Sequence, residues 1–314
     1  MSRPCILLTN DDGIEANGLH ALIRALHARG FPLMVLAPAN EQSASGMRLT
    51  LHRDLTVTRR DDVLAELELN SDGPLVELIS VDASPCDAVI LALEELEQLF
   101  SHEMVPALCV SGINLGPNVS IDVLHSGTVA AARQAAVYGI PAISTSLGTF
   151  DHDDYSHAVE ASLKVVEAAV DSIPHTPANR LRPNGIRGPD QLEGHSPLES
   201  LRMAFHRGDA MLNVNCSGGW NGSYQTTRLG ARWYRGAIEM SSVELDEHSC
   251  RIGAKEIVLE PVEAGDADAI AAGSTSVTTL ATWPQTHPLA ISGILLQAAM
   301  ESDRDGLPRW LTEE

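Results

Sequence analysis

The feature that most constrains the fold is the run CILLTNDDGIEANGL at residues 5–19, where an apolar segment leads directly into Asn10-Asp11-Asp12-Gly13. A helix-like run, LHALIRALHARG, follows from Asn17. This order predicts a buried strand, a tight acidic turn and a helix, which is how an open α/β sheet begins. In such sheets, ligands bind just beyond the carboxyl ends of the strands. The two carboxylates are therefore expected at the functional edge of the sheet.

Asp11 and Asp12 repel each other, and no basic residue lies close to them in the sequence. A solvated acidic turn would tolerate the pair, and so would a bound cation. Carboxylate oxygens suit Mg²⁺, Mn²⁺ or Ca²⁺. Because the pair directly follows the first apolar strand, we favour the metal site.

The pattern of strand and helix then repeats along the chain. Apolar strand patterns occupy residues 33–38, 75–80, 107–114 and 140–147, and helical patterns fall at 85–100, 128–139 and 154–172. Ser84 and Pro85 are suited to the N-cap and the first turn of one helix. Alternating elements predict a three-layer, doubly wound, Rossmann-like and mostly parallel sheet. The short strand-like pieces 210–216, 232–240 and 256–260 suggest a C-terminal antiparallel extension at its edge, and a helix-like run, 291–302, lies near the end of the chain.

Composition suggests a division of the chain near residue 210. We expect a Rossmann-like catalytic core at 1–210, in which the Pro- and Gly-rich stretch 174–208 forms a flexible insert. Residues 211–314 would be a C-terminal extension that completes the fold and forms an oligomer interface.

Charge and cysteine content exclude several classes of function. The formal net charge is −21, which argues against a nucleic-acid polymer as partner because phosphate contacts need Lys and Arg. No run of about 18 apolar residues predicts a membrane span, and no secretory signal is apparent. The five cysteines form no C-x-x-C pair, which indicates reduced thiols and a cytoplasmic protein.

Three further loops follow predicted strands of the same sheet. APANEQSASG at 37–46 offers the hydroxyls of Ser43 and Ser45, and VSGINLGPN at 110–118 offers the amide oxygen of Asn114. In HSGTVAAA at 125–132, Ser126 and Thr128 open a helix whose N-terminal amides can hold an anion. Taken singly, each is equally an ordinary polar loop or a simple N-cap. Together they predict a divalent cation beside a phosphate cradle, and hence metal-assisted hydrolysis of a phosphate ester.

Other catalytic patterns fit less well. The twelve histidines show no H-E-x-x-H spacing for zinc, and no G-x-S-x-G elbow of a serine hydrolase is present. Adjacent aspartates differ from the D-x-D of phosphatases with an aspartate nucleophile. His125, beside the cradle, either orients the substrate or protonates a leaving oxygen, or it simply packs there or faces water.

The motifs LLTNDDGI, AP-x-x-EQSASG, SGIN-x-GPN and HSGTVAAAR, in this order, resemble the SurE family of nucleotidases, most closely over residues 5–148. The resemblance implies a metal-dependent phosphatase of nucleoside 5′-monophosphates, with 3′-monophosphates and polyphosphate as further substrates. It implies one Mg²⁺ or Mn²⁺ per subunit and a dimer or tetramer. The metal ligands then fall on Asp11, Asp12, Ser43 and Asn114, with catalysis at the two aspartates, and the substrate residues are Asn118, Ser126, Gly127 and Thr128.

Departures from the family pattern leave alternatives open. Ser120 stands where the family usually has glycine, Asn213-Val214-Asn215-Cys216-Ser217 replaces N-x-N-x-P, and Ala281 and Trp283 replace the His and Asp of a C-terminal element. A nucleotide-binding regulatory protein that kept the cation site but turns over little is therefore the second hypothesis. A metal-dependent sugar transferase is a third, against which the Ser-Gly-Thr cradle argues. The sequence does not choose between bases, between 5′ and 3′ phosphates, between metals, or between dimer and tetramer.

Overall fold

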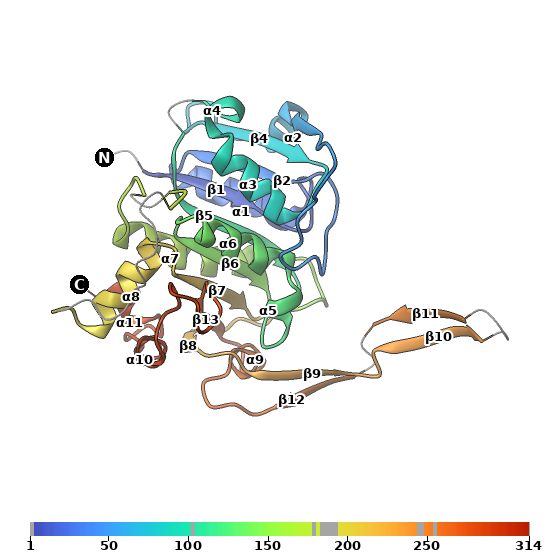
Figure 1. Ribbon diagram of the computed structural model, residues 1–314, viewed down its shortest axis with the longest axis vertical. Helices are drawn as coiled ribbons and strands as arrows, with labels where there is room; N and C mark the ends of the chain where they lie inside the picture. Colours follow the sequence, from blue (N-terminus) through green and yellow to red (C-terminus); the bar gives the residue numbers. More distant parts are fainter. Residues whose placement is uncertain are drawn as a thin grey trace.

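A nine-stranded sheet lies between two layers of helices in the computed structural model (Figure 1), which describes residues 3–101, 104–177, 180–182, 194–243, 248–253 and 256–313. The strand order is β3-β4-β2-β1-β5-β6-β7-β13-β8. These strands are β1 (Cys5–Thr9), β2 (Leu33–Pro38), β3 (Val57–Arg59), β4 (Val76–Val81), β5 (Pro106–Leu115), β6 (Ala142–Leu147), β7 (Ala210–Cys216), β8 (Tyr224–Thr227) and β13 (Thr275–Ala281). The predicted fold class, mostly parallel with antiparallel strands on the C-terminal side, is confirmed.

The strand order reverses between β1 and β5. From β1 the chain proceeds outward through β2 and β4 on one side, and through β5, β6 and β7 on the other, all of them parallel. This reversal is the topological switch point, outside which open α/β sheets bind their ligands. Asp11 and Asp12 follow β1, and Asn114 lies near the end of β5, so the predicted metal ligands come from the two strands that flank the switch point.

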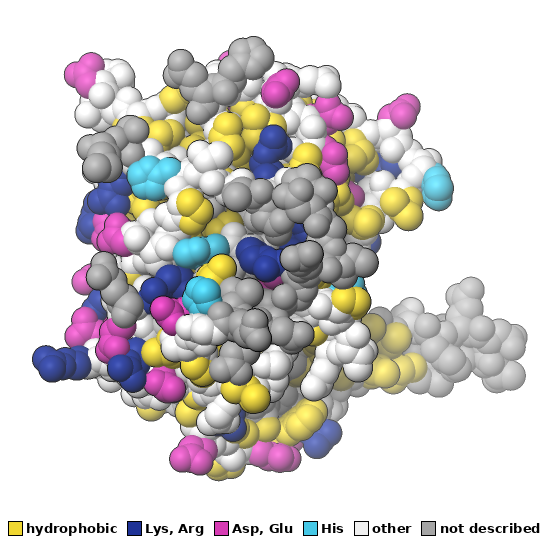
Figure 2. Space-filling view, turned by 60° about the vertical axis from the view of Figure 1, so that its left-hand side comes forward, with side chains coloured by type: hydrophobic (Ala, Val, Ile, Leu, Met, Phe, Trp, Pro, Cys, Tyr) yellow, Lys and Arg dark blue, Asp and Glu magenta, His cyan; other side chains and the backbone are white. Residues whose placement is uncertain are grey.

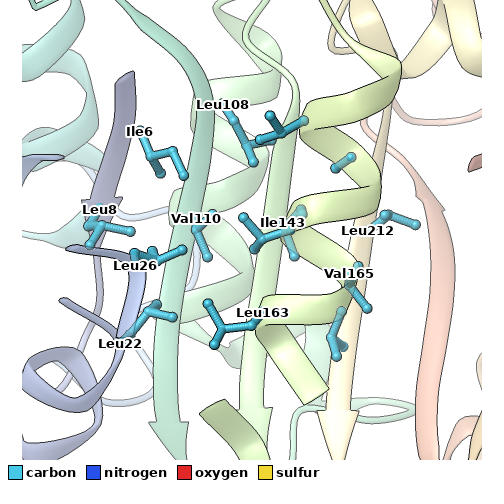
Figure 3. Packing of buried hydrophobic residues seen from close by; sticks show 14 of the residues in the cluster. Ile6, Leu8, Leu22, Leu26, Leu108, Val110, Ile143, Leu163, Val165 and Leu212 are labelled. Atoms are coloured by element: carbon cyan, nitrogen blue, oxygen red, sulfur yellow. The ribbon is translucent and has the colours of Figure 1, made fainter. Parts of the chain in front are cut away.

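Each face of the sheet has its own apolar core. One face packs against α1 (Asn17–Ala28), α7 (Ser156–Ser172) and α8 (Pro197–His206), and Figure 3 shows Leu22 and Leu26 of α1 directed toward the strands. The other face packs mainly against α3 and α6. The remaining helices are short or lie at the ends of the sheet. Helix bounds not yet given are α2 (Asp61–Glu66), α3 (Pro85–Glu94), α4 (Leu96–Leu99), α5 (Asp122–His125), α6 (Gly127–Val137), α9 (Asp266–Ala271), α10 (Gly293–Ala298) and α11 (Arg309–Thr312).

The C-terminal part differs in detail from the expected extension. β7 is still parallel to β6, and the antiparallel arrangement begins only at β13, which pairs with β7. The predicted strand 232–240 is two strands, β9 (Ala231–Arg235) and β10 (Ile238–Val243). β9 pairs with β12 (Glu256–Glu260), and β10 with β11 (His248–Ile252). These four strands, called the arm below, project away from the sheet instead of extending its edge (Figure 1).

Local signals in the sequence behave as predicted at α3. The Ser84 side chain accepts from the Asp87 amide, the Asp87 carboxylate accepts from the Ser84 amide, and Pro85 occupies the first turn. The predicted helix 85–100 is interrupted at Glu95, where α3 ends and α4 begins.

Within the proposed insert 174–208, residues 178–179 and 183–193 lie outside the described part, and α8 occupies the end of the stretch. The boundary at residue 210 stays a prediction. No helix in the described part of the chain is long and apolar enough to cross a membrane.

Gly18 controls how closely α1 approaches the functional edge. A Cβ built on Gly18 would lie 2.0 Å from the carbonyl oxygen of Ile113 and 2.8 Å from the Tyr155 ring. We expect Gly18→Ala to destabilise the protein by about 1–3 kcal/mol, because the helix must move off β5. A lower midpoint in urea unfolding would show this.

Gly293→Ala is the matched control. Gly293 also begins a helix, and an added Cβ there meets nothing within 4 Å. It should leave the midpoint unchanged or raise it slightly. Equal midpoints for the two variants would contradict the tight contact at Gly18.

Candidate active site at the β1–β5 switch point

The acidic turn after β1 is held by its neighbours. The Asn10 side chain donates to the Gly13 carbonyl oxygen at 2.8 Å and accepts from the Gly13 amide at 3.2 Å, which closes the turn on itself. The amide of Gln42 donates to the Asp11 carbonyl oxygen at 2.7 Å, so the loop after β2 is attached to the turn after β1. Two of the four loops predicted to meet at this edge are therefore in direct contact.

Asp11 is almost fully buried, with 3% of its surface exposed. Burial raises the pKa of its carboxyl group, because the ionised form loses hydration, while hydrogen bonds from the Thr128 hydroxyl and from the amides of Thr128 and Gly127 partly oppose the rise. Within the described ranges, no Lys or Arg forms an ion pair with Asp11 or Asp12. The negative charge thus has no side-chain counter-ion.

Asp12 is partly buried beside it. Burial, and then repulsion from Asp11, raises the pKa of Asp12 to about 7. The Leu115 amide donates to Asp12 Oδ2 at 3.3 Å, which connects the turn after β1 with the end of β5. Two neighbouring carboxyl groups with raised pKa values are costly for an isolated protein, and a bound cation would relieve that cost.

Oxygen atoms of Asp11 and Asn114 meet at the Thr128 hydroxyl. The Thr128 hydroxyl contacts Asp11 Oδ1 and lies 3.1 Å from Asn114 Oδ1. The amide nitrogen of Asn114 donates instead to the carbonyl oxygens of Leu115 and Gly116, which leaves the amide oxygen facing Thr128. A hydroxyl has one proton to donate, so it cannot satisfy both acceptors. A hard cation accepts such a set of carboxylate, amide and hydroxyl oxygens, and the residues present therefore fit one.

The remaining predicted ligand, Ser43, is oriented differently. Its side chain is exposed and donates to Glu41 Oε1 at 2.7 Å. Ser45, on the same loop, instead has a buried hydroxyl without a hydrogen-bond partner among the described residues. A Cβ on Gly127 would lie 2.5 Å from that hydroxyl oxygen and 2.8 Å from Asp11 Oδ2. Ser45 is thus at the start of α6, and only glycine fits between it and Asp11.

The start of α6 shows the simple N-cap, and the phosphate cradle stays a prediction. Ser126 is the N-cap, and its side chain accepts from the Val129 amide at 3.0 Å. The amides of Gly127 and Thr128 are directed at the Asp11 carboxylate. His125, just before the cradle, has an exposed side chain, and its carbonyl oxygen accepts from the Gly46 amide.

Asn118 is held by two asparagines of β7, Asn213 and Asn215, whose contact with it the sequence did not reveal. Its amide donates to Asn215 Oδ1 at 2.7 Å, and its carbonyl oxygen accepts from the side chains of Asn213 and Asn215. Asn118 Nδ2 donates to Ser146 Oγ at 2.9 Å. Asn213 and Asn215 alternate along β7 and therefore share one face, which was the available signal for a common function.

The structure shows the surroundings of two departures from the family pattern, Ser120 and the C-terminal element with Ala281 and Trp283. Ser120 has φ of +53°, a left-handed conformation that favours glycine, and its hydroxyl compensates by donating to the Gly230 carbonyl oxygen and accepting from the Arg232 amide. Ala281 pairs with Ala210, at the amino end of β7. Trp283 donates to Asp209 Oδ1 at 3.1 Å. The altered C-terminal element therefore lies at the edge of the sheet opposite to Asp11 and Asp12.

Comparison with known proteins identifies the family. The model of survival protein SurE matches residues 6–236. The chain belongs to the SurE family. Relatives named 5′-nucleotidase SurE include that of Carboxydothermus hydrogenoformans, 44% identical over 49% of this chain and 54% of its own length, and that of Prochlorococcus marinus strain MIT 9313, 36% identical over 64% and 68%. The chain spans about half to two thirds of the length of these curated relatives.

A solved structure with lower sequence identity has the same fold. The crystal structure of the SurE protein from Aquifex aeolicus superposes with a TM-score of 0.64 at 25% identity, over 90% of this chain and 95% of that one. No group of three or more His, Cys, Asp or Glu side chains suited to a metal occurs in the described part of this chain. A SurE-like site would accordingly depend on two carboxylates and neutral oxygens.

The different environments of the two serines lead to a paired prediction. Ser43→Ala should weaken Mn²⁺ binding about tenfold, since an exposed hydroxyl can turn from Glu41 toward a cation. Ser45→Ala should retain Mn²⁺ affinity and weaken vanadate binding, because its buried hydroxyl lies at the start of α6 where an anion is expected. Isothermal titration of both variants with Mn²⁺ and then vanadate measures this. If Ser43→Ala weakened vanadate binding and Ser45→Ala weakened Mn²⁺ binding instead, Ser45 would be the metal ligand and Ser43 the anion-binding residue.

Proposed function

We propose that this chain is a divalent-metal-dependent phosphatase that hydrolyses nucleoside 5′-monophosphates to nucleoside and phosphate. The observation that carries the proposal is the buried Asp11 beside Asp12, without a basic partner in the described residues, whose carboxylate shares the Thr128 hydroxyl with the amide oxygen of Asn114. The relatives named 5′-nucleotidase SurE support the substrate class. We include 3′-monophosphates and polyphosphate as further substrates to be tested.

In this proposal, one group of residues binds the metal and another binds the substrate. Asp11, Asp12, Ser43 and Asn114 would hold one Mg²⁺ or Mn²⁺ per subunit, which would polarise a phosphoryl oxygen and acidify a water molecule. Ser126, Gly127 and Thr128 would bind the phosphate through hydroxyls and helix N-terminal amides. Asn118, fixed by Asn213 and Asn215, would position the substrate on the side of β6. The protein would thus bind an anion without lysine or arginine, although its net charge is −21.

The regulatory alternative was motivated by Ala281 and Trp283. Because these residues lie at the opposite edge of the sheet, they give no reason to expect the loss of turnover. A cytoplasmic location is consistent with the five free cysteines, four of which are buried.

Asp12→Asn tests the proposed function directly. The substitution preserves shape and removes one negative charge, so activity toward nucleoside monophosphates with Mg²⁺ or Mn²⁺ should fall by at least about 100-fold. Stability should not fall, because repulsion from Asp11 disappears. Initial rates of phosphate release and urea midpoints measure the two effects.

Asp72→Asn, in an exposed turn far along the chain, is the control for loss of a negative charge. It should retain wild-type rates. Near-normal rates in Asp12→Asn, or no metal-dependent hydrolysis by the wild-type chain, would refute the proposed function.

The arm supports self-association as a dimer or tetramer, with residues of about 220–260 at the interface. Its apolar side chains are unusually exposed, including Ile252 at 84%, Ile238 at 63% and Met240 at 50%. Hydrophobic side chains, drawn in yellow, are visible in Figure 2 where the projecting segment leaves the body of the molecule. Exposed strands and apolar surface of this kind are normally covered by another chain.

Ile238→Glu combined with Ile252→Glu should abolish this association, because the two residues are cross-strand partners and both charges would be desolvated at an interface. Light scattering should give at least twice 33.6 kDa for the wild type and about the mass of one chain for the variant. Leu75→Glu, an exposed apolar position near β4, is the control and should retain the wild-type mass. A wild-type monomer would contradict the proposed assembly.

A further inference from the structure

A cavity of about 310 Å³ lies between the loops after β5 and β6, the base of the arm and α9. Pro117 and Val119 line it on one side, Gly148–Asp151 on another, and Arg232 closes part of it. The volume is at the lower end of the range of about 300–1,000 Å³ for small-molecule sites, and the lining is apolar with a few polar groups. The cavity is thus suited to one small, flat and mostly apolar group.

Its position connects it with the proposed phosphate site. Asn118 stands between the two lining residues Pro117 and Val119. Pro117 is three residues beyond Asn114, and a chain of three residues spans at most about 11 Å. A group attached to a phosphate held near Asn114 and Thr128 could therefore reach the cavity.

Phe150 presents an aromatic ring at this border. A Cβ on Gly116 would lie 2.1 Å from the ring, so the ring packs directly on the backbone between Asn114 and Pro117. The residue is nevertheless 68% exposed. An aromatic ring supported from one side and open on the other is a platform on which a nucleobase can stack.

Arg232 supplies an unused donor. The residue is 6% exposed, its Nη1 lies 3.4 Å from Asp122 Oδ2, and its guanidinium lies over the Tyr234 ring. Its Nε has no hydrogen-bond partner among the described residues. A buried N–H without an acceptor is costly, and a ligand atom that accepts a hydrogen bond would remove that cost.

We propose that the cavity binds the base of a 6-oxopurine nucleotide, guanine or hypoxanthine, with Phe150 stacked on the ring and Arg232 donating to its O6. This inference depends on the proposed function for the attached phosphate. Guanine and hypoxanthine present the acceptor O6, which suits an arginine donor, whereas adenine presents an amino donor in place of O6. The exposed carboxylate of Asp151, also in the lining, can accept from the N1–H of either base.

The first test compares substrates on the full-length chain with Mg²⁺ or Mn²⁺. We expect kcat/KM for GMP and IMP to exceed that for AMP by about tenfold or more, because a site built to donate a hydrogen bond rejects an analogue that cannot accept it. Ribose 5-phosphate, which has no base, should be the poorest substrate. AMP equal to or better than GMP would overturn the 6-oxopurine assignment.

The second test uses Phe150. Phe150→Ala should lower kcat/KM for GMP about tenfold more than for ribose 5-phosphate, whereas Phe150→Tyr, which keeps the aromatic plane, should restore the preference. Equal losses on both substrates would assign Phe150 to the fold and overturn its role in stacking.

The third test separates the cavity from catalysis. Saturation-transfer NMR with guanosine, without phosphate or metal, should detect binding to the wild type and weaker binding to Arg232→Lys, whose folding is checked by circular dichroism. If Arg232→Lys does not fold, competition between guanosine and adenosine on the wild type decides the same point. Absence of guanosine binding overturns this inference even if the phosphatase is active. Guanosine binding without hydrolysis of any ester would support the cavity and refute the proposed function.

Discussion

The burial of Asp11 against the first turn of α6 is the interaction on which the candidate site depends. Its carboxylate accepts from the Thr128 hydroxyl and from the amides of Thr128 and Gly127, and these donors are the main compensation that the described structure offers it. That contact places the end of β1, the loop after β2 and the start of α6 within one small volume. The compensation is incomplete, since burial still raises the pKa of Asp11, and this deficit is the physical reason to expect a cation.

The central strands were predictable because burial on both faces makes them apolar throughout. β1, β2, β5 and β6 all coincide closely with apolar runs in the sequence. β13 was missed as a strand because TSVTTLA is rich in threonine and serine, which are buried there but carry no apolar signal. The arm was misplaced for another reason, since alternating exposed strands look the same at the edge of a sheet and beyond it.

The strand topology allowed us to predict which residues of the site lie near one another. Parallel strands direct their carboxyl ends to one edge, so Asp11, Asn114 and Thr128 had to lie near one another once the strand order was known. The orientations of Ser43 and Ser45 could not follow from sequence, because they depend on how one loop packs against Gly127. Arg232 is more than a hundred residues from Asp122, and no local pattern signals that contact.

The base of the arm is hydrogen-bonded to the loop that leads into α6. Arg232 and Tyr234 belong to β9, and both contact Asp122, which opens the short helix just before Ser126. Ser120, in its left-handed conformation, connects the same loop to β9 from the other side. In the proposed dimer or tetramer, a partner chain that contacts the arm would therefore act on Asp122 and on the loop that leads into α6. The proposed self-association and the proposed substrate binding would then depend on the same hydrogen bonds.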